Sequence, residues 1–153
     1  MKKFVAVLLA AVLCLSFAAC GGEKATDKTV DAAAMFKALL NDVTYTDNAT
    51  ELDSSMAGVL LGGELPDGTE AYLAANDSAY LRCAVFACKD KDAAAAVKKL
   101  IQTYIDDSID AKYNVDEVAL LQNAKIHSIG NYVAVAVTSD TDNVNKVIDQ
   151  YFA

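Results

Sequence analysis

The stretch "AYLRCAVFACKDKDAAAAVKKLI", residues 79–101, contains two hydrophobic periodicities that together decide the fold. Its first half is rich in strand-forming residues and predicts a β-strand over residues 79–88. Its second half repeats apolar residues at helical spacing and predicts a helix over residues 90–109, with acidic residues at its start that suit an N-cap. A strand followed directly by an amphipathic helix indicates a domain in which helices pack on a sheet.

The flanking sequence repeats this order of elements. Tight turns are expected at residues 76–78 and at Gly130-Asn131, so that two hairpins form, each followed by a helix. The further expected elements are strands over 71–75, 123–129 and 132–139 and a helix over 140–152. This order predicts an α+β domain with a largely antiparallel sheet of about four strands and helices packed on it.

The two halves of this pattern are also alike in detail. Residues 79–104 and 131–152 can be aligned with Tyr80 on Tyr132, which indicates a ββα pseudo-repeat. The shared physics of burial is the alternative explanation. N-terminal helical segments precede the repeat: one helix is expected over residues 29–43 with Thr29 as its N-cap, and a short one ends at Gly62 and Gly63.

The central strands alternate aliphatic residues with a second set of tyrosine, phenylalanine and alanine. We expect the aliphatic set to face the two later helices: Leu81, Cys83, Val85, Val133, Val135 and Val137. The other face is expected to be covered by the N-terminal helices, and an exposed interaction surface is the alternative. Its aromatic members are the candidate binding residues: Tyr72, Tyr80, Phe86 and Tyr132.

The N-terminus predicts a lipid anchor. Two lysines, a short apolar run and the small residues before Cys20 resemble the signal peptide and lipobox of bacterial lipoproteins. The apolar run is shorter than the roughly 20 residues of a spanning helix. We expect Cys20 to carry a diacylglyceryl group and become the mature N-terminus, with acyl chains such as palmitate holding it on the membrane. An ordinary cleaved signal and an uncleaved anchor are the alternatives.

The chain is accordingly divided into three parts. Residues 1–19 are expected to be the signal peptide, residues 20–29 the lipidated cysteine and a flexible tether, and residues 30–153 a single domain. Removing residues 1–19 takes away two of the 13 basic residues and none of the 21 acidic ones, which leaves a net charge near −10. Such a balance argues against nucleic acid as a partner.

The residues that carry chemistry form no recognisable catalytic or metal-binding motif. Cys83 and Cys88 lie about 17 Å apart on opposite faces of one strand, so we expect both to be buried and unpaired. His127 beside Ser128 lacks the pattern of a nucleophile elbow and is expected to be a surface residue. Residues 140–143 lack the glycine of a calcium loop. We therefore expect no catalytic residue, no metal ligand and no cofactor.

Three segments carry a family resemblance: "MFKALLNDVTYTDNATELDSSM" (35–56), "YLRCAVFACKDKDAAAAVKKLI" (80–101) and "NAKIHSIGNYVAVAVTSD" (123–140). Together with the lipobox they resemble bacterial lipoproteins that contain a domain of unknown function, DUF4358, and the likeness runs from about Phe36 to Tyr151. Leu61 departs from the pattern, because members tend to have an aromatic residue before the glycine at position 62. The resemblance implies a lipid-anchored protein of Gram-positive anaerobes and supplies no activity.

These observations predict a non-enzymatic module on the outer face of the cytoplasmic membrane. Its expected partners are the membrane, through the lipid on Cys20, and an unknown envelope protein or small ligand. Capture of a small solute for a neighbouring transporter is one alternative. A cell-envelope hydrolase that uses His127 is the other.

Overall fold

The computed structural model describes residues 29–111 and 114–153. The elements of these residues follow one another along the chain as α1 (Ala32–Asp42), β1 (Thr50–Leu52), α2 (Met56–Leu61), β2 (Glu70–Ala75), β3 (Leu81–Ala87), α3 (Lys91–Asp110), α4 (Val115–Asn123), β4 (Lys125–Ile129), β5 (Tyr132–Ala136) and α5 (Thr141–Phe152). The strands form one five-stranded sheet in the order β1-β2-β3-β5-β4, and every neighbouring pair is antiparallel. The predicted α+β class is confirmed.

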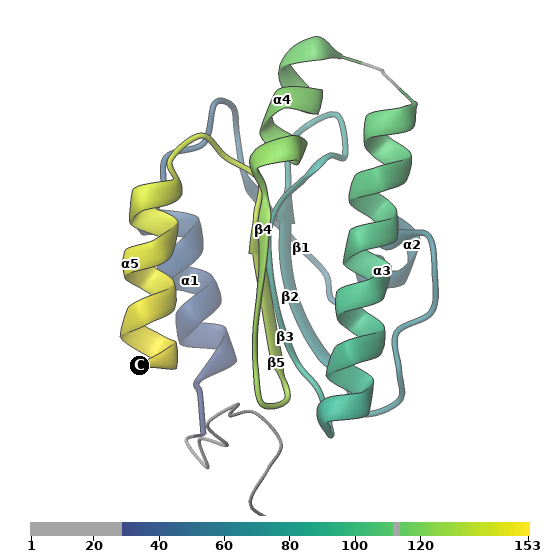
Figure 1. The fold of residues 1–153 in the computed structure, drawn as a ribbon, viewed down its shortest axis with the longest axis vertical. Helices are drawn as coiled ribbons and strands as arrows, with labels where there is room; N and C mark the ends of the chain where they lie inside the picture. Colours follow the sequence, from purple (N-terminus) through teal and green to yellow (C-terminus); the bar gives the residue numbers. More distant parts are fainter. Residues whose placement is uncertain (1–28, 112–113) are drawn as a thin grey trace, which may run out of the picture.

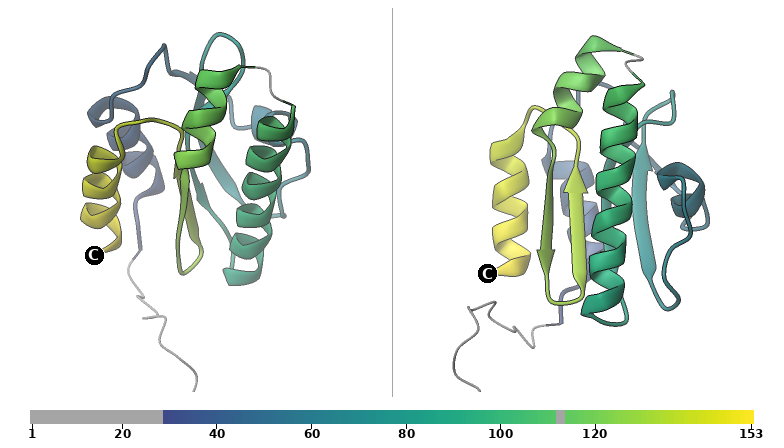
Figure 2. Two further views of the ribbon diagram at one scale, coloured as in Figure 1. Left: turned by 45° about the horizontal axis from the view of Figure 1, so that its top comes forward. Right: turned by 45° about the vertical axis from the view of Figure 1, so that its right-hand side comes forward.

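Helices cover both faces of the sheet. Figure 1 shows α1 and α5 side by side on one face and α3 on the other, and both views in Figure 2 keep this arrangement. Each face has its own apolar cluster. One cluster joins the sheet to α2, α3 and α4, and the other joins it to α1 and α5. The domain therefore has three layers, with the sheet in the middle.

The prediction of which strand residues share a face is only partly correct. Cys83 and Val85 pack in the cluster of α1 and α5, whereas the other four predicted residues pack in the cluster of α3: Leu81, Val133, Val135 and Val137. Residues directly opposite each other in an antiparallel pair lie on the same face, and the register pairs Phe86 with Val133 and Val85 with Ala134. Phe86 and Val133 pack in the cluster of α3, whereas Val85 and Ala134 pack in the cluster of α1 and α5. The alternation of large and small side chains did not reveal the faces, because almost all of β3 is buried on both sides.

The expectation that the N-terminal helices cover one face of the sheet is confirmed for α1 and wrong for α2, which packs on the opposite face. Phe36 and Leu39 of α1 are fully buried in the same cluster as Cys83 and Val85. The expectation that both later helices share the opposite face is wrong, since α5 lies beside α1. An eleven-residue helix alone covers only part of a sheet face, and α5 covers the part nearer to β5.

The two ββα units agree in element order but differ in their arrangement in space. Strands β3 and β5 are antiparallel neighbours, yet α3 and α5 cover opposite faces. The two-fold rotation that exchanges two antiparallel neighbouring strands has its axis perpendicular to the sheet. It therefore keeps each face of the sheet on the same side. No such rotation can therefore place α3 on α5.

Local sequence signals explain where the helices begin and end. Asp31 is the N-cap of α1 in place of the predicted Thr29, and its carboxylate accepts a hydrogen bond from the Ala34 amide at 2.9 Å. Asp90 caps α3 in the same way, as predicted. Helix α2 ends at Gly62, which has a φ of 72° and lets the Gly63 amide bond back to the Gly58 carbonyl.

Two elements escaped the sequence analysis. Strand β1 has only three residues, too few to show a period, and α4 lies in a stretch where no element was assigned. The predicted signal peptide and Cys20 lie outside the described residues. Within residues 29–111 and 114–153, no helix is both long enough and apolar enough to cross a membrane.

Candidate functional site

An open cavity of about 370 Å³ lies at the end of β3, where the strand leads into Cys88. Its walls come from the start of α1, the start of β2, the end of β3 and the start of β5. The lining residues are Thr29, Val30, Asp31, Ala32, Ala33, Gly68, Glu70, Tyr72, Ala87, Cys88 and Tyr132. The volume is within the range typical of small-molecule sites. We call this site the tyrosine cavity, because Tyr72 and Tyr132 are its large side chains.

The fold holds the two tyrosines in place. Both are half-buried and pack against the apolar cluster under α1. The Tyr72 ring lies 6.2 Å from the Phe36 ring, centre to centre and tilted by 30°, and this contact anchors it to α1. The Tyr72 hydroxyl lies 3.4 Å from a carboxylate oxygen of Glu70, to which it donates. The aromatic wall and one carboxylate are thus positioned together.

The charged residues that line the tyrosine cavity, Asp31 and Glu70, are both acidic. Burial raises the pKa of the Tyr72 hydroxyl, and the nearby carboxylates of Glu70 and Asp31 raise it further. None of the described lining residues is basic. The cavity therefore combines aromatic surface with a negative potential.

A second open cavity of about 410 Å³ adjoins the first. It is lined by Ser54, Ser55, Leu65, Thr69, Glu70, Ala71 and Tyr72. Because Glu70 and Tyr72 line both cavities, these two side chains form a shared wall. Strand β1 pairs with β2 only at residues 73–75, so this part of β2 has no strand beside it on that edge.

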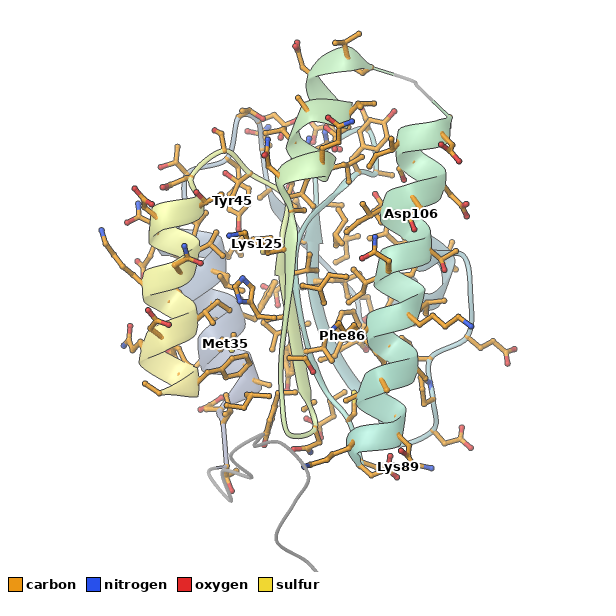
Figure 3. All side chains as sticks on the ribbon, viewed as in Figure 1. Met35, Tyr45, Phe86, Lys89, Asp106 and Lys125 are labelled. Atoms are coloured by element: carbon orange, nitrogen blue, oxygen red, sulfur yellow. The ribbon has the colours of Figure 1, made fainter. Side chains whose placement is uncertain are left out.

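The four aromatic candidates from the sequence do not form one surface. Tyr72 and Tyr132 meet in the tyrosine cavity, whereas Phe86 is fully buried against α3, as Figure 3 shows for its labelled side chain. Tyr80 follows the turn between β2 and β3 at the other end of the sheet, where its amide binds the Asn76 side chain. The structure thus brings together two of the four residues.

Sequence reasoning missed a charged cluster at the opposite end of β3. Arg82, with 1% of its surface exposed, lies between Asp47 of the loop after α1 and Glu117 of α4. Its guanidinium donates two hydrogen bonds to each carboxylate, at 2.6 to 2.9 Å, and one to the Leu81 carbonyl. All five N–H donors of the arginine are therefore used.

The electrostatics of this cluster indicate a structural role. Burial disfavours the charge of Arg82, but its hydrogen bonds to Asp47 and Glu117 outweigh that effect and raise its pKa. The same hydrogen bond lowers the pKa of Asp47 to about 2. The only signal in the sequence was an arginine inside an apolar strand, and 21 acidic residues offered too many partners.

His127 gives no support to hydrolytic chemistry. It is half-buried on β4, not on the surface as expected, and its Nε2 atom has no hydrogen-bond partner among the described residues. Burial and the charge of Lys125 lower its pKa, and Asp149 acts against them. The cavity beside it holds about 10 Å³, room for roughly one water molecule.

The two cysteines of the described residues are buried in the core and have the environment of structural residues. Cys83 and Cys88 are buried, unpaired and in different apolar clusters, as predicted. Burial raises the pKa of the Cys83 thiol to about 12, which makes it unreactive at neutral pH. Within the part of the chain that is described, no three residues of the metal-binding types come together.

The fold and the cavity define a class of small α+β domain with an antiparallel sheet between two helical layers and an aromatic, acidic cavity at one end. Residues 66–138, from the turn before β2 to the end of β5, match the family model described as domain of unknown function (DUF4358). This match confirms the resemblance to DUF4358 over residues 66–138. No curated protein and no solved structure matched the chain.

Proposed function

We propose that this protein is a lipid-anchored, non-enzymatic binding module on the outer face of the cytoplasmic membrane, and that the tyrosine cavity is its binding site. The cavity itself carries the proposal. It has an aromatic wall that is held in place, exposed carboxylates and a volume suited to a small ligand or a single side chain of a partner.

The position of the cavity fits a lipid anchor at Cys20. Thr29 lines the cavity, and nine residues, 20–28, precede it after the signal peptide. A chain of that length spans at most about 30 Å. The cavity would then remain within about 30 Å of the bilayer surface, where membrane proteins and solutes entering the cell are within reach.

The anchor is tested by Cys20→Ser, with Cys14→Ser as the matched control. We expect Cys20→Ser to leave the precursor uncleaved or to release the protein from membranes, and Cys14→Ser to change nothing. Fractionation and intact-mass analysis of the mature protein provide the measurement. Normal processing and membrane retention of Cys20→Ser would contradict the anchor.

Binding at the cavity is tested by photo-crosslinking in intact cells. A photoreactive phenylalanine replaces Ala33, which lines the cavity, or Thr103, which is exposed on α3. We expect specific crosslinked products from position 33 and none from position 103. Equal crosslinking from both positions, or none from position 33, would count against the cavity as the binding site.

A second candidate, capture of a small solute for a neighbouring transporter, is favoured by the cavity volume. It predicts that the product at position 33 has the mass of a small molecule and not of a protein. The hydrolase alternative has less support, because no hydrogen bond joins His127 Nε2 to a described carboxylate or hydroxyl.

A further inference from the structure

The tyrosine cavity has carboxylates that are not committed to any cation. Asp31 and Glu70 are exposed at its wall, and neither forms an ion pair with a described residue. Among the described residues, the Asp31 carboxylate accepts a hydrogen bond from the Ala34 amide, and the Glu70 carboxylate accepts the long one, at 3.4 Å, from Tyr72. Both carboxylates therefore keep acceptor capacity for a donor that enters the cavity.

The aromatic rings complement these carboxylates. The face of a tyrosine ring attracts a positively charged group within about 6 Å of its centre. Tyr72 and Tyr132 supply two such rings, and Phe36 supports the first of them. A ligand with a positive head and an apolar stem would satisfy both features of the wall at once.

We infer that the tyrosine cavity binds an organic ammonium group, carried by a free amine or by a lysine side chain of a protein. This inference rests on the proposed function, since it names the ligand class of the same site. A short alkylammonium is much smaller than the cavity of about 370 Å³, so either source fits.

Two positive features lie near the cavity. The N-terminus of α1 carries a partial positive charge of roughly half a unit, which the full charge of Asp31 outweighs. The stem of Lys89 packs beside Gly68 at the rim, where a Cβ on Gly68 would lie 3.4 Å from it. Lys89 is thus a positive competitor among the described residues, and it provides a test.

The inference is tested by NMR titration of the full lipidated chain in uncharged maltoside micelles, which contain no ammonium group that could compete. The probes are butylammonium, its neutral analogue 1-butanol, and Nα-acetyl-lysine methylamide as a model of a protein-borne lysine. We expect both ammonium probes to shift the amide signals of residues 30–33, 70–72 and 132, and 1-butanol to bind at least fivefold more weakly. The stronger binder of the two ammonium probes identifies the source.

Charge variants show which carboxylates contribute to the binding of the ammonium group. Glu70→Gln and Asp31→Asn, the second of which keeps the N-cap, are each expected to weaken butylammonium binding about fivefold and to leave 1-butanol unchanged. Lys89→Met is expected to strengthen butylammonium binding about twofold, since it removes a competing charge. Asp106→Asn, on α3 on the other side of the sheet, is the matched control and should change nothing.

The outcomes separate this inference from the proposed function. Equal affinity for butylammonium and 1-butanol would overturn the ammonium assignment and leave a cavity that binds apolar groups. Absence of binding by either ammonium probe would also overturn it, whereas the crosslinking from position 33 decides the proposed function independently. Signal shifts confined to residues away from the cavity would also overturn the ammonium assignment and leave the proposed function to the crosslinking result.

Discussion

The polar side chains around the two ends of β3 differ in burial and in the number of their hydrogen bonds. At its first end, Arg82 is buried and each of its donors binds an acceptor from another part of the chain. At its last end, the carboxylates and tyrosines of the tyrosine cavity are partly exposed and have few partners. The difference separates stability from binding, because the Arg82 guanidinium has no donor left for a ligand, whereas the carboxylates at the cavity keep acceptor capacity.

The Arg82 end joins three segments that are distant in the sequence. Asp47 and Glu117 each lie 35 residues from Arg82, on either side of it along the chain. The loop after α1 and the start of α4 are thus fastened to the sheet at one point. The tyrosine cavity joins four elements, but through packing and without an ion pair between described residues.

The largest effect is expected from Arg82→Met, which should lower the free energy of unfolding by about 3–5 kcal/mol because it leaves Glu117 buried without its partner. Urea denaturation followed by circular dichroism measures this change. The double variant Arg82→Met/Glu117→Leu is the control, and it should recover much of the loss, since no buried charge remains. A loss below about 1 kcal/mol for the single variant would show that the cluster is not a structural clamp.

A smaller effect is expected from Asp47→Asn, because the Asp47 side chain is 41% exposed. We expect a loss of about 1–2 kcal/mol at neutral pH. The pKa of Asp47 is lowered from 3.8 to about 2 in the folded protein, so its contribution is present above about pH 4 and disappears as the pH falls towards 2. Unfolding curves of both proteins at pH 7 and pH 2 test this: a difference in stability that is unchanged at pH 2 would contradict the assignment.

The turn at the Arg82 end offers a stabilising change. Ala79 has a φ of 61°, a conformation that favours glycine, in the turn that closes the β2–β3 hairpin. We expect Ala79→Gly to raise the free energy of unfolding by about 1 kcal/mol. The matched control Ala95→Gly, at an exposed position in α3, should lower it by about 1 kcal/mol. Destabilisation by both variants would show that the turn does not favour glycine.

Sequence periodicity predicted the hairpins and the two long helices because these depend on residues close together along the chain. The strand and helix of residues 79–101 and the stop at Gly62 are examples. The faces of the sheet could not be predicted in the same way. They depend on the register between β3 and β5, which are separated by two helices and β4, and β3 is apolar on both sides.

The candidate site was predictable only in part, for the same physical reason. Tyr72 and Tyr132 were identified as aromatic residues in strands, but their meeting depends on how β2 and β5 flank β3. Phe86 is also an aromatic residue in a strand, but it packs on the opposite face of the sheet, because one step along a strand reverses the face. The pairing of Arg82 with Glu117 required the position of α4, an element that the sequence pattern did not show.

The smallest effect on stability is expected at the tyrosine cavity, from Glu70→Gln. Glu70 is exposed, its one hydrogen bond from Tyr72 is long, and the charge of Asp31 lies near the same ring. We expect the free energy of unfolding to change by less than about 0.5 kcal/mol. Tyr132→Phe, which keeps the ring, should be similarly neutral. A loss above about 1 kcal/mol for Glu70→Gln would mean that this carboxylate stabilises the fold as Asp47 does, and the distinction between the two ends of β3 would no longer hold.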